Sequence, residues 1–331
     1  MKLSRARVIL HPFSLVYGWY VEKRKTFYAK GWLKQKRLNG TVISVGNLTA
    51  GGTGKTPMVL WLAEKFVREG KNVAILSRGY RGSHGTSDEV QLLKQRLGTR
   101  VRFGVGADRF AQGRRLEQEQ VVDVFLLDDG FQHLQLARDL DILMLDGSRK
   151  LRDESLLPAG LLREPIAACR RADILVVTRK FERPNIEARD AHKFAIFYAQ
   201  TRLLGFRQPG YSTEPLYLSE VGPGPFFAFC GIGNPDAFFS DLSHWHVPVA
   251  GTRAFSDHHK YSRKDLAKLE RAAELSGAKA LITTEKDAQN LPPEGCHLPL
   301  WLAVIDFVFG AESELLAAID RILECRRGVA A

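Results

Sequence analysis

The residues best suited to chemistry form one glycine-rich run, Gly51-Gly52-Thr53-Gly54-Lys55-Thr56. Glycines let consecutive backbone N–H groups turn toward an anion, a lysine at this spacing reaches the outer phosphates, and the threonine hydroxyl can bind Mg²⁺. The strict pattern for such a loop has a glycine six residues before the lysine, where this chain has Thr49. We expect the backbone N–H groups from Thr49 and Ala50 through Thr56, together with the Lys55 ammonium, to hold phosphate groups.

The segments on either side of this loop have the patterns of a strand and a helix. Residues 41–45 are mostly β-branched, as in a buried strand, and apolar residues recur at helical spacing over 58–66. Pro57 suits the first turn of that helix, where a missing N–H costs nothing. The loop would therefore lie at a helix N-terminus, whose unsatisfied donors and dipole favour a phosphate.

Two carboxylates follow the hydrophobic run 121–127, which predicts a further buried strand. Asp128 and Asp129 would stand at the carboxyl end of this strand, and His133 follows closely. In a protein with a phosphate loop, carboxylates placed there can hold Mg²⁺ or its water shell. A helix cap is the alternative role for these two aspartates, and we favour it less.

Other polar groups are less specific. Arg78, in the run Ser-Arg-Gly-Tyr at 77–80, could bind an anionic substrate or line a turn. His258 follows Asp257 in a loop before a predicted helix, where the two side chains could transfer protons. On residue types alone, a surface loop or a helix-capping turn is the favoured interpretation of His258. The same caution applies to the run Thr-Glu-Lys-Asp at 284–287.

The composition indicates a globular protein of about two domains. The chain has 331 residues, of which 45% are hydrophobic and 26% charged. Predicted strands alternate with predicted helices, which indicates an α/β fold with a mostly parallel sheet and helices on both faces. A stretch rich in proline and glycine, 205–225, is typical of a linker. We therefore predict a phosphate-binding domain over 41–204 and a smaller α/β domain over 226–331.

The individual elements follow from the apolar runs. Further strands are predicted over 72–77, 121–127, 140–145, 172–178, 194–199, 226–230, 247–251, 280–283 and 300–304, and further helices over 88–97, 235–242, 263–276 and 312–325. The four cysteines are scattered without a C-x-x-C pair. This spacing argues against a zinc site or a disulfide framework and favours a reducing compartment.

Residues 1–40 form a basic N-terminal arm. The chain carries a formal net charge of +11, and this arm holds ten lysines and arginines against one acid, Glu22. Its uncharged stretch, 8–21, is too short to span a bilayer and is not followed by a small-residue cleavage site. Apolar and aromatic residues at helical spacing, with basic residues between them, are typical of an amphipathic helix in a membrane interface. A helix packed on the domain with a solvated basic face is nearly as good an interpretation, and a nucleic-acid arm ranks last.

Taken in order, the motifs of the chain resemble those of the tetraacyldisaccharide 4′-kinases of lipid A synthesis. The resemblance extends over nearly the whole chain and depends most on two specific stretches, Asp-Asp-Gly-Phe-Gln-His at 128–133 and Leu-Pro-Ala-Gly-Leu-Leu-Arg-Glu-Pro at 157–165. The other motifs are Val-Gly-Asn-Leu-Thr at 45–49, the glycine-rich run with Pro57, Ser-Arg-Gly-Tyr at 77–80, Asp-His at 257–258 and Thr-Glu-Lys-Asp-Ala at 284–288.

The resemblance implies that the protein is an enzyme with a P-loop NTPase-type sheet. With Mg²⁺, it would transfer the γ-phosphate of ATP to the 4′-hydroxyl of a tetraacylated glucosamine disaccharide 1-phosphate. The family's proposed base is an aspartate in a Gly-Asp-Glu-Pro stretch, assisted by the histidine of its Asp-His motif. Here that stretch is Ser-Asp-Glu-Val at 87–90, so Asp88 and His258 are expected to act together although the flanking glycine and proline are absent. The other implied roles are catalysis for Lys55 and Asp129, metal binding for Thr56, Asp128 and Glu164, and substrate contact for Asn47, Arg78 and His133.

The resemblance also implies a location and partners. Extracting a tetraacylated lipid from a bilayer costs ~0.8 kcal/mol per exposed CH₂, so the enzyme must reach its substrate at the membrane. We expect a peripheral protein whose basic arm contacts the anionic cytoplasmic face of the bacterial inner membrane. We expect a monomer with no nucleic-acid partner.

Two functions of other classes stay open. A nucleotide-switch ATPase that dimerises on ATP carries a similar glycine-rich loop, but such proteins usually have a lysine where this chain has Ala50. A non-catalytic module that uses the basic arm on nucleic acid would instead show salt-dependent binding without turnover.

Overall fold

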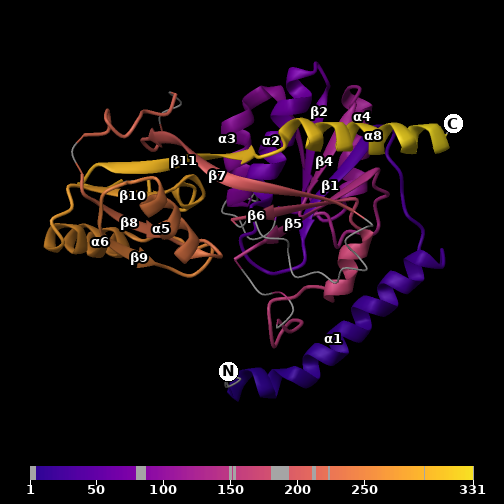
Figure 1. Cartoon of the computed structure of the whole chain (residues 1–331), viewed down its shortest axis with the longest axis horizontal. Helices are drawn as coiled ribbons and strands as arrows, with labels where there is room; N and C mark the ends of the chain where they lie inside the picture. Colours follow the sequence, from indigo (N-terminus) through magenta and orange to yellow (C-terminus); the bar gives the residue numbers. More distant parts are fainter. Residues whose placement is uncertain are drawn as a thin grey trace. The chain divides into compact units, whose positions relative to one another are not determined.

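The computed structural model describes residues 5–79, 87–148, 151, 154–179, 194–210, 214–222, 224–293 and 295–330. The chain forms two compact units (Figure 1). The first comprises Met1–Tyr80, Arg96–Gln200 and Val308–Ala331, and the second comprises Arg81–Gln95 and Thr201–Phe307. Tyr80 of the Ser-Arg-Gly-Tyr motif, residues 1–4 of the arm, and residues 211–213 and 223 of the predicted linker lie outside the described residues.

The described part of the first unit contains a parallel sheet with the strand order β3-β2-β4-β1-β5-β6-β7. Each neighbouring pair in this order is parallel. Strands β1, β2, β4, β5 and β6 are buried along almost their whole length, which explains why their sequences read as continuous apolar runs. The strands are β1 Thr41–Asn47, β2 Val73–Ser77, β3 Arg102–Val105, β4 Val124–Asp128, β5 Leu140–Asp146, β6 Ile174–Thr178 and β7 Ala195–Arg207.

Helices cover both faces of this sheet. The crossover from β1 to β2 through α2 (Lys55–Arg68) and the crossover from β3 to β4 through α4 (Arg109–Glu119) run in opposite directions across the sheet. Because such crossovers are right-handed, α2 and α4 lie on opposite faces. Helix α8 (Glu312–Ala330) lies beside α2, where Lys65 Nζ is 3.6 Å from Asp320 Oδ1. The predicted α/β fold class is confirmed.

Strands β1 and β4 lie side by side, and they end together. Val45 of β1 is the register partner of Asp128 of β4, so the segments that follow the two strands leave the same edge of the sheet. Gly46 makes this approach possible, because a Cβ there would lie 2.5 Å from the Cβ of Phe131. The glycine-rich loop and the Asp-Asp-Gly-Phe-Gln-His motif are therefore neighbours.

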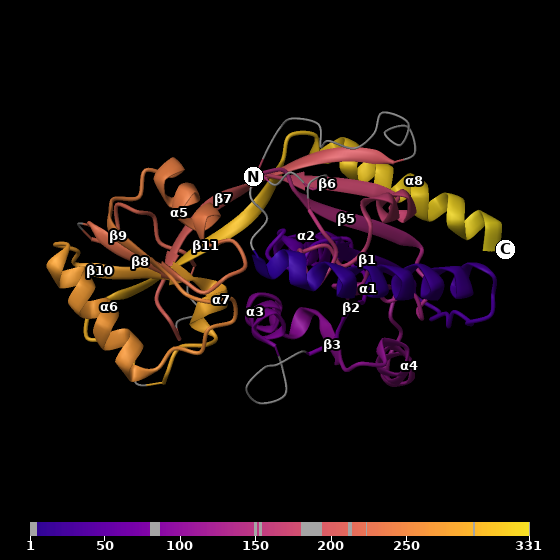
Figure 2. The same cartoon turned by 90° about the horizontal axis from the view of Figure 1, so that it is seen from below.

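Helix α1 (Arg5–Ala29) belongs to the first unit (Figure 2) and contacts it through polar side chains. Ser14 Oγ donates to the carbonyl of Leu156, Tyr17 Oη donates to that of Arg163, and Arg24 donates to that of Gln132. Several of its apolar side chains are instead exposed to solvent: Phe13 is 62% exposed, Val16 67% and Trp19 64%. Among the described helices, none combines the length and the apolar character that a bilayer crossing requires.

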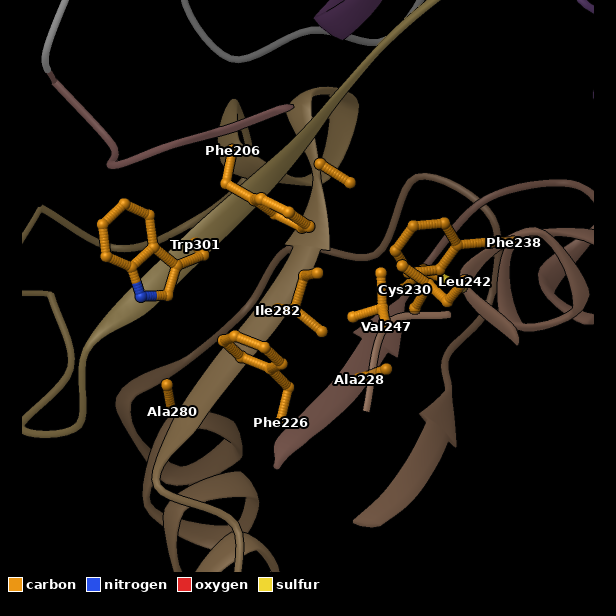
Figure 3. Close-up of a cluster of buried hydrophobic side chains, with 11 residues drawn as sticks. Phe206, Phe226, Ala228, Cys230, Phe238, Leu242, Val247, Ala280, Ile282 and Trp301 are labelled. Carbon is orange, nitrogen blue, oxygen red and sulfur yellow. The ribbon is translucent and has the colours of Figure 1, made fainter. Parts of the chain in front are cut away.

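The second unit contains the strands β11, β10, β8 and β9, which pair in this order and run parallel. Its elements are β8 Phe226–Cys230, α5 Pro235–His244, β9 Val249–Ala254, α6 Arg263–Leu275, β10 Ala280–Thr284, α7 Glu285–Ala288 and β11 Leu300–Phe309, with the first eight residues of α3 (Asp88–Leu97). Figure 3 shows one of its apolar clusters, in which Phe206 stacks on Phe226 with ring centroids 6.2 Å apart, and Ile282, Phe238 and Leu242 lie nearby.

The boundaries differ from the expected ones in three respects. Helix α8 belongs to the first unit although it was assigned to the smaller domain, because it packs beside α2. Residues 81–95 belong to the second unit although they fall inside the expected range 41–204. Strand β7 runs on to Arg207, into the predicted linker, and a bridge pairs Phe206 with Leu216, so the 205–225 stretch is partly structured. Strand β3 and helix α4 were not predicted.

Candidate active site

The glycine-rich loop joins β1 to α2 in the expected strand–loop–helix arrangement. Gly54 precedes the helix with a φ of 85°, a left-handed conformation suited to glycine, and no side chain caps the helix N-terminus. The buried side chain of Asn47 holds the loop from below, since its Nδ2 donates to Thr53 Oγ1 at 2.9 Å. The N-terminal donors of α2 are thus left for an anion, as the phosphate-loop hypothesis requires.

The first residues of the loop are tied to a neighbouring segment. The backbone N–H of Ala50 donates to the carbonyl of Leu161 at 2.7 Å, and Arg163 donates its N–H to the carbonyl of Leu48 at 2.7 Å. The N–H of Ala50 was predicted to hold phosphate, but here it is already engaged. This hydrogen bond contradicts the role predicted for the N–H of Ala50, whereas the N–H groups of Thr49 and of 51–56 stay predicted phosphate donors.

Asp129 lies between two cations. Its Oδ1 is 3.5 Å from Lys55 Nζ, and its Oδ2 accepts a hydrogen bond of 2.6 Å from Arg163. Burial acts to raise the pKa of Asp129, but Lys55 and Arg163 hold it below its usual range. The residue has a positive φ of 49°, an uncommon conformation that aspartate tolerates better than most side chains. Asp129 is therefore ionised and directed at the lysine of the phosphate loop.

The three predicted metal ligands are not equivalent. Asp128 is buried at the end of β4, and Thr56 lies in the first turn of α2. Both carboxylate oxygens of Glu164 accept from Arg171, at 2.6 Å and 3.0 Å. The guanidinium of Arg171 also lies 4.3 Å from the ring centroid of Phe131. Glu164 thus forms an ion pair with Arg171. Thr56 and Asp128 carry the hydroxyl and carboxylate oxygens that Mg²⁺ prefers as ligands.

The predicted substrate residues have separate environments. Asn47 is fully buried beneath the loop, which makes it a loop-supporting residue. Arg78 is exposed just after β2. Burial and the cations Arg109 and Arg24 lower the pKa of His133 to about 4, so its imidazole is neutral at physiological pH. A neutral imidazole can donate or accept a hydrogen bond but adds no charge.

The second unit brings Asp88 and His258 together, although 170 positions separate them in the sequence. Nδ1 of His258 lies 2.9 Å and 3.0 Å from the two carboxylate oxygens of Asp88. Asp88 opens α3, and His258 has a left-handed backbone with a φ of 59° and donates its N–H to the carbonyl of Gly231. The hydrogen bond to Asp88 raises the pKa of His258, while the side chain of His258 stays 48% exposed. A buried carboxylate thus meets an accessible imidazole.

Further charges surround this pair. Lys286 Nζ lies 3.1 Å from Glu89, 3.4 Å from Asp257 and 3.8 Å from Asp88. Burial acts to raise the pKa of Asp88, but the hydrogen bond with His258 and the charge of Lys286 hold it well below its usual range. Ligand atoms of Asp88, Glu89 and His258 come within 4.8 Å of one another, as in a metal site. The ammonium of Lys286 already occupies the centre of that negative charge.

A buried aspartate fixes the segments that carry this cluster. Asp287 is 1% exposed and accepts hydrogen bonds from Tyr261 Oη at 2.7 Å, Thr284 Oγ1 at 2.6 Å and the N–H of Gly231 at 2.7 Å. The carbonyl of Gly231 in turn accepts from the N–H of His258. Asp287 therefore joins the Lys286 segment to the His258 loop.

Several of these residues were missed at the sequence level. Three of them lie within the sequence motifs described above: Arg163, Lys286 and Asp287. Their partners are far away in the sequence, so no local pattern assigned them a role. Arg109 is buried, and its Nη2 donates to the carbonyl of Asp128 at 3.3 Å. A buried arginine in a polar helix has no periodic signature, so the sequence alone could not reveal it.

Comparisons with known proteins agree with the motifs. A family model described as tetraacyldisaccharide-1-P 4′-kinase matches residues 6–324. The tetraacyldisaccharide 4′-kinase of Geobacter metallireducens is 40% identical over 336 residues, covering 95% of this chain and 98% of the relative. The enzyme of that name from Geobacter sulfurreducens is 36% identical, covering 96% and 93%.

A solved structure agrees as well. The crystal structure of LpxK from Aquifex aeolicus in complex with ATP matches at 30% identity with a TM-score of 0.75, covering 96% of this chain and 99% of that chain. Sequence motifs, full-length relatives and fold thus point the same way, and the resemblance stated from the motifs is confirmed. The chain belongs to the tetraacyldisaccharide-1-phosphate 4′-kinase family.

Proposed function

We propose that this protein transfers the γ-phosphate of ATP to the 4′-hydroxyl of a tetraacylated glucosamine disaccharide 1-phosphate, a step of lipid A synthesis. The observation that carries the proposal is the 3.5 Å approach of Lys55, in the phosphate loop, to Asp129, in the family's Asp-Asp-Gly-Phe-Gln-His motif. The relatives bear the name of this activity, and the related LpxK structure contains ATP. The nucleotide-switch alternative is not favoured.

Phosphate binding falls to the first unit. The N–H groups of residues 51–56 and the N-terminus of α2 surround the phosphates, and Lys55 neutralises their charge. Bound Mg²⁺ would supply further neutralisation of the phosphate charge. Thr56 and Asp128 are the residues whose oxygens suit this ion. Asp129 keeps Lys55 directed over the loop.

Proton acceptance falls to the pair in the second unit. A sugar hydroxyl has a very high pKa, so a carboxylate need accept its proton only late in a loose phosphoryl-transfer transition state. Asp88 is ionised at neutral pH and is the acceptor, and His258 orients it and takes up positive charge as the proton arrives. Arg78 is assigned to the 1-phosphate and His133 to a neutral hydrogen bond with the acceptor.

Helix α1 is assigned to the membrane surface. Its polar face is bound to the first unit through Ser14 and Tyr17, whereas Phe13, Val16 and Trp19 stay exposed. An ordinary packed helix has the opposite arrangement, with its apolar face toward the protein. We therefore favour a peripheral monomer at the cytoplasmic face of the inner membrane, held by apolar insertion and by basic residues worth about 1 kcal/mol each near an anionic surface.

An acceptor panel tests the proposed reaction. The purified protein is incubated with γ-labelled ATP and with lipid, sugar and nucleoside acceptors, and label is expected only on the tetraacyl disaccharide 1-phosphate, at the 4′ position. Label on another acceptor, or ATP hydrolysis that needs a protein partner, would refute the assignment.

Vesicle flotation tests the membrane assignment. The intact protein should float with anionic vesicles, and high salt should weaken but not abolish the binding, because the Debye length falls to ~3 Å at 1 M while apolar insertion survives. A Phe13→Ser, Trp19→Ser variant should stay in solution with an unchanged melting temperature, since both side chains are exposed. Equal flotation of this variant would mean that α1 is not the membrane contact.

A further inference from the structure

One cation stands at the centre of the acidic cluster in the second unit. Three carboxylates gather there, Asp88 and Glu89 from the start of α3 and Asp257 from the loop after β9. Lys286 of α7 is within 4 Å of an oxygen of all three, at 3.8 Å, 3.1 Å and 3.4 Å respectively. Among the described residues, the other cationic group within ion-pair distance of these acids is the imidazole of His258.

The imidazole of His258 faces acids through both of its nitrogens. Nδ1 contacts Asp88, while Nε2 lies 3.7 Å from Glu89 and 3.8 Å from Asp257. The neighbouring imidazole of His259 pairs with Asp265 instead, at 3.3 Å. Three acids around one imidazole favour its protonated form, and a protonated pair cannot receive a further proton as readily.

The positive charge of Lys286 opposes this protonation of His258. From these distances we infer that Lys286 is a positioning residue of the proposed reaction, whose ammonium keeps the Asp88–His258 pair in its proton-accepting form near neutral pH. The inference depends on the proposed function for its catalytic consequence, but not for its electrostatic part.

The setting of Lys286 fits a fixed charge rather than a mobile surface lysine. Its side chain is 22% exposed, and the residue sits between Glu285 and Asp287, both buried. Thr284 caps α7 by accepting from the N–H of Asp287, and Arg207 holds Glu285 through a 2.7 Å hydrogen bond. The backbone that carries Lys286 is thus anchored on both sides. The charges of Glu89, Asp88 and Asp257 together overcome burial and raise the pKa of Lys286, so the ammonium persists at all working pH values.

The test follows the imidazole directly. In the whole protein with labelled histidine, the NMR titration of His258, assigned by its absence in His258→Gln, is compared between wild type and Lys286→Met. Removing a unit charge at this range should move the His258 midpoint up by about one pH unit. The Lys286→Arg variant retains the charge and should titrate near wild type. Lys268→Met, on the exposed side of α6, is the matched control and should change nothing.

Kinetics supply the second readout. The acid limb of the kcat–pH profile of Lys286→Met should move up with the His258 midpoint, so kcat at pH 7 falls by up to about fivefold and recovers at higher pH, while KM for ATP stays unchanged. Lys286→Gln, a polar variant, serves if the Met variant does not fold. An unmoved His258 midpoint in both neutral variants overturns the inference, and so does an equal upward movement in Lys286→Arg. If the wild type transfers no phosphate to the lipid acceptor, the proposed function fails while the NMR result still stands.

Discussion

In two regions of this protein an aspartate lies close to a lysine. The charges around the two contacts differ, and so do the roles that the contacts can have. In the first unit, Lys55 and Asp129 are 3.5 Å apart, and Arg163 adds a second cation at 2.6 Å. In the second unit, Lys286 and Asp88 are 3.8 Å apart, but the same lysine is shared with two further carboxylates. Around the first contact cations outnumber carboxylates, and around the second contact carboxylates outnumber cations.

The difference separates anion binding from proton acceptance. A surplus of positive charge beside a helix N-terminus attracts phosphate. A surplus of carboxylates around an imidazole attracts protons, and one lysine limits that attraction. Two aspartate–lysine pairs with similar distances therefore need not have similar roles, because the neighbouring charges decide what each pair can bind.

The largest effect is expected at the lysine of the cation-rich region. Lys55→Ala should lower phosphoryl transfer by about a thousandfold, since it removes a charge aimed at the transferring group. The fold should be retained, as judged by an unchanged melting temperature. Lys71→Ala, an exposed lysine of the same unit, is the control and should keep full activity. Near wild-type turnover in Lys55→Ala would contradict the phosphate-loop assignment.

The aspartate of the same region should come next. Asp129→Ala leaves Lys55 and Arg163 without their shared carboxylate, so both side chains lose the partner that orients them. We expect a loss of several hundredfold in kcat, larger than for either residue of the Asp88–His258 pair. Steady-state kinetics with both substrates decide the order, and a smaller loss than at Asp88 would reverse the ranking of the two regions.

In the carboxylate-rich region, Asp88→Ala and His258→Ala should each lower kcat about a hundredfold and change KM little. The two residues share a hydrogen bond of 2.9 Å, so the double variant should be far from additive. A double-mutant cycle on kcat measures this coupling. If the two losses simply multiply, His258 acts independently of Asp88 and returns to a structural role.

The smallest effect concerns the neutral imidazole in the cation-rich region. The pKa of His133 is lowered in the folded state to about 4, against 6.5 for an unperturbed histidine. Between these values the unfolded chain binds the extra proton, so the folded state loses stability as pH falls from 6.5 toward 4. His133→Gln should remove that loss. The drop in melting temperature from pH 7 to pH 5 should be a few degrees smaller for the variant than for wild type. Equal drops in the two proteins would show that His133 is not held neutral.

The sequence predicted most of the first region because its signals are local. The strand, the loop and the helix of residues 41–68 are contiguous, and the β4 carboxylates stand one strand away at the same register. Helix α4 gave no such signal, because only Arg109, Gly113 and Leu116 of it are buried and it lacks an apolar stripe. Strand β3 is a four-residue edge strand with a single buried residue.

The second region could not be assembled from residue patterns. Asp88 and His258 are 170 positions apart, and on residue types alone His258 was assigned to a surface loop or a capping turn. Only the family resemblance paired them. Lys286 was visible in its motif, but its effect depends on three carboxylates contributed by two other segments. Likewise, no residue pattern paired Glu164, a predicted metal ligand, with Arg171 of the turn at residues 166–171.

The backbone at Asp129 and at His258 restricts which sequences these two positions can accept. Both residues have positive φ values, 49° and 59°, in a region that asparagine, aspartate and histidine enter far more readily than β-branched residues do. A library of all replacements at each position should therefore yield three groups. Asparagine and glycine should give folded proteins with little activity, and valine and isoleucine should give poorly expressed proteins. Only the native side chain should give a protein that is both folded and fully active. A replacement at position 129 or 258 must therefore meet two separate requirements, a positive φ of the backbone and the chemistry of the native side chain.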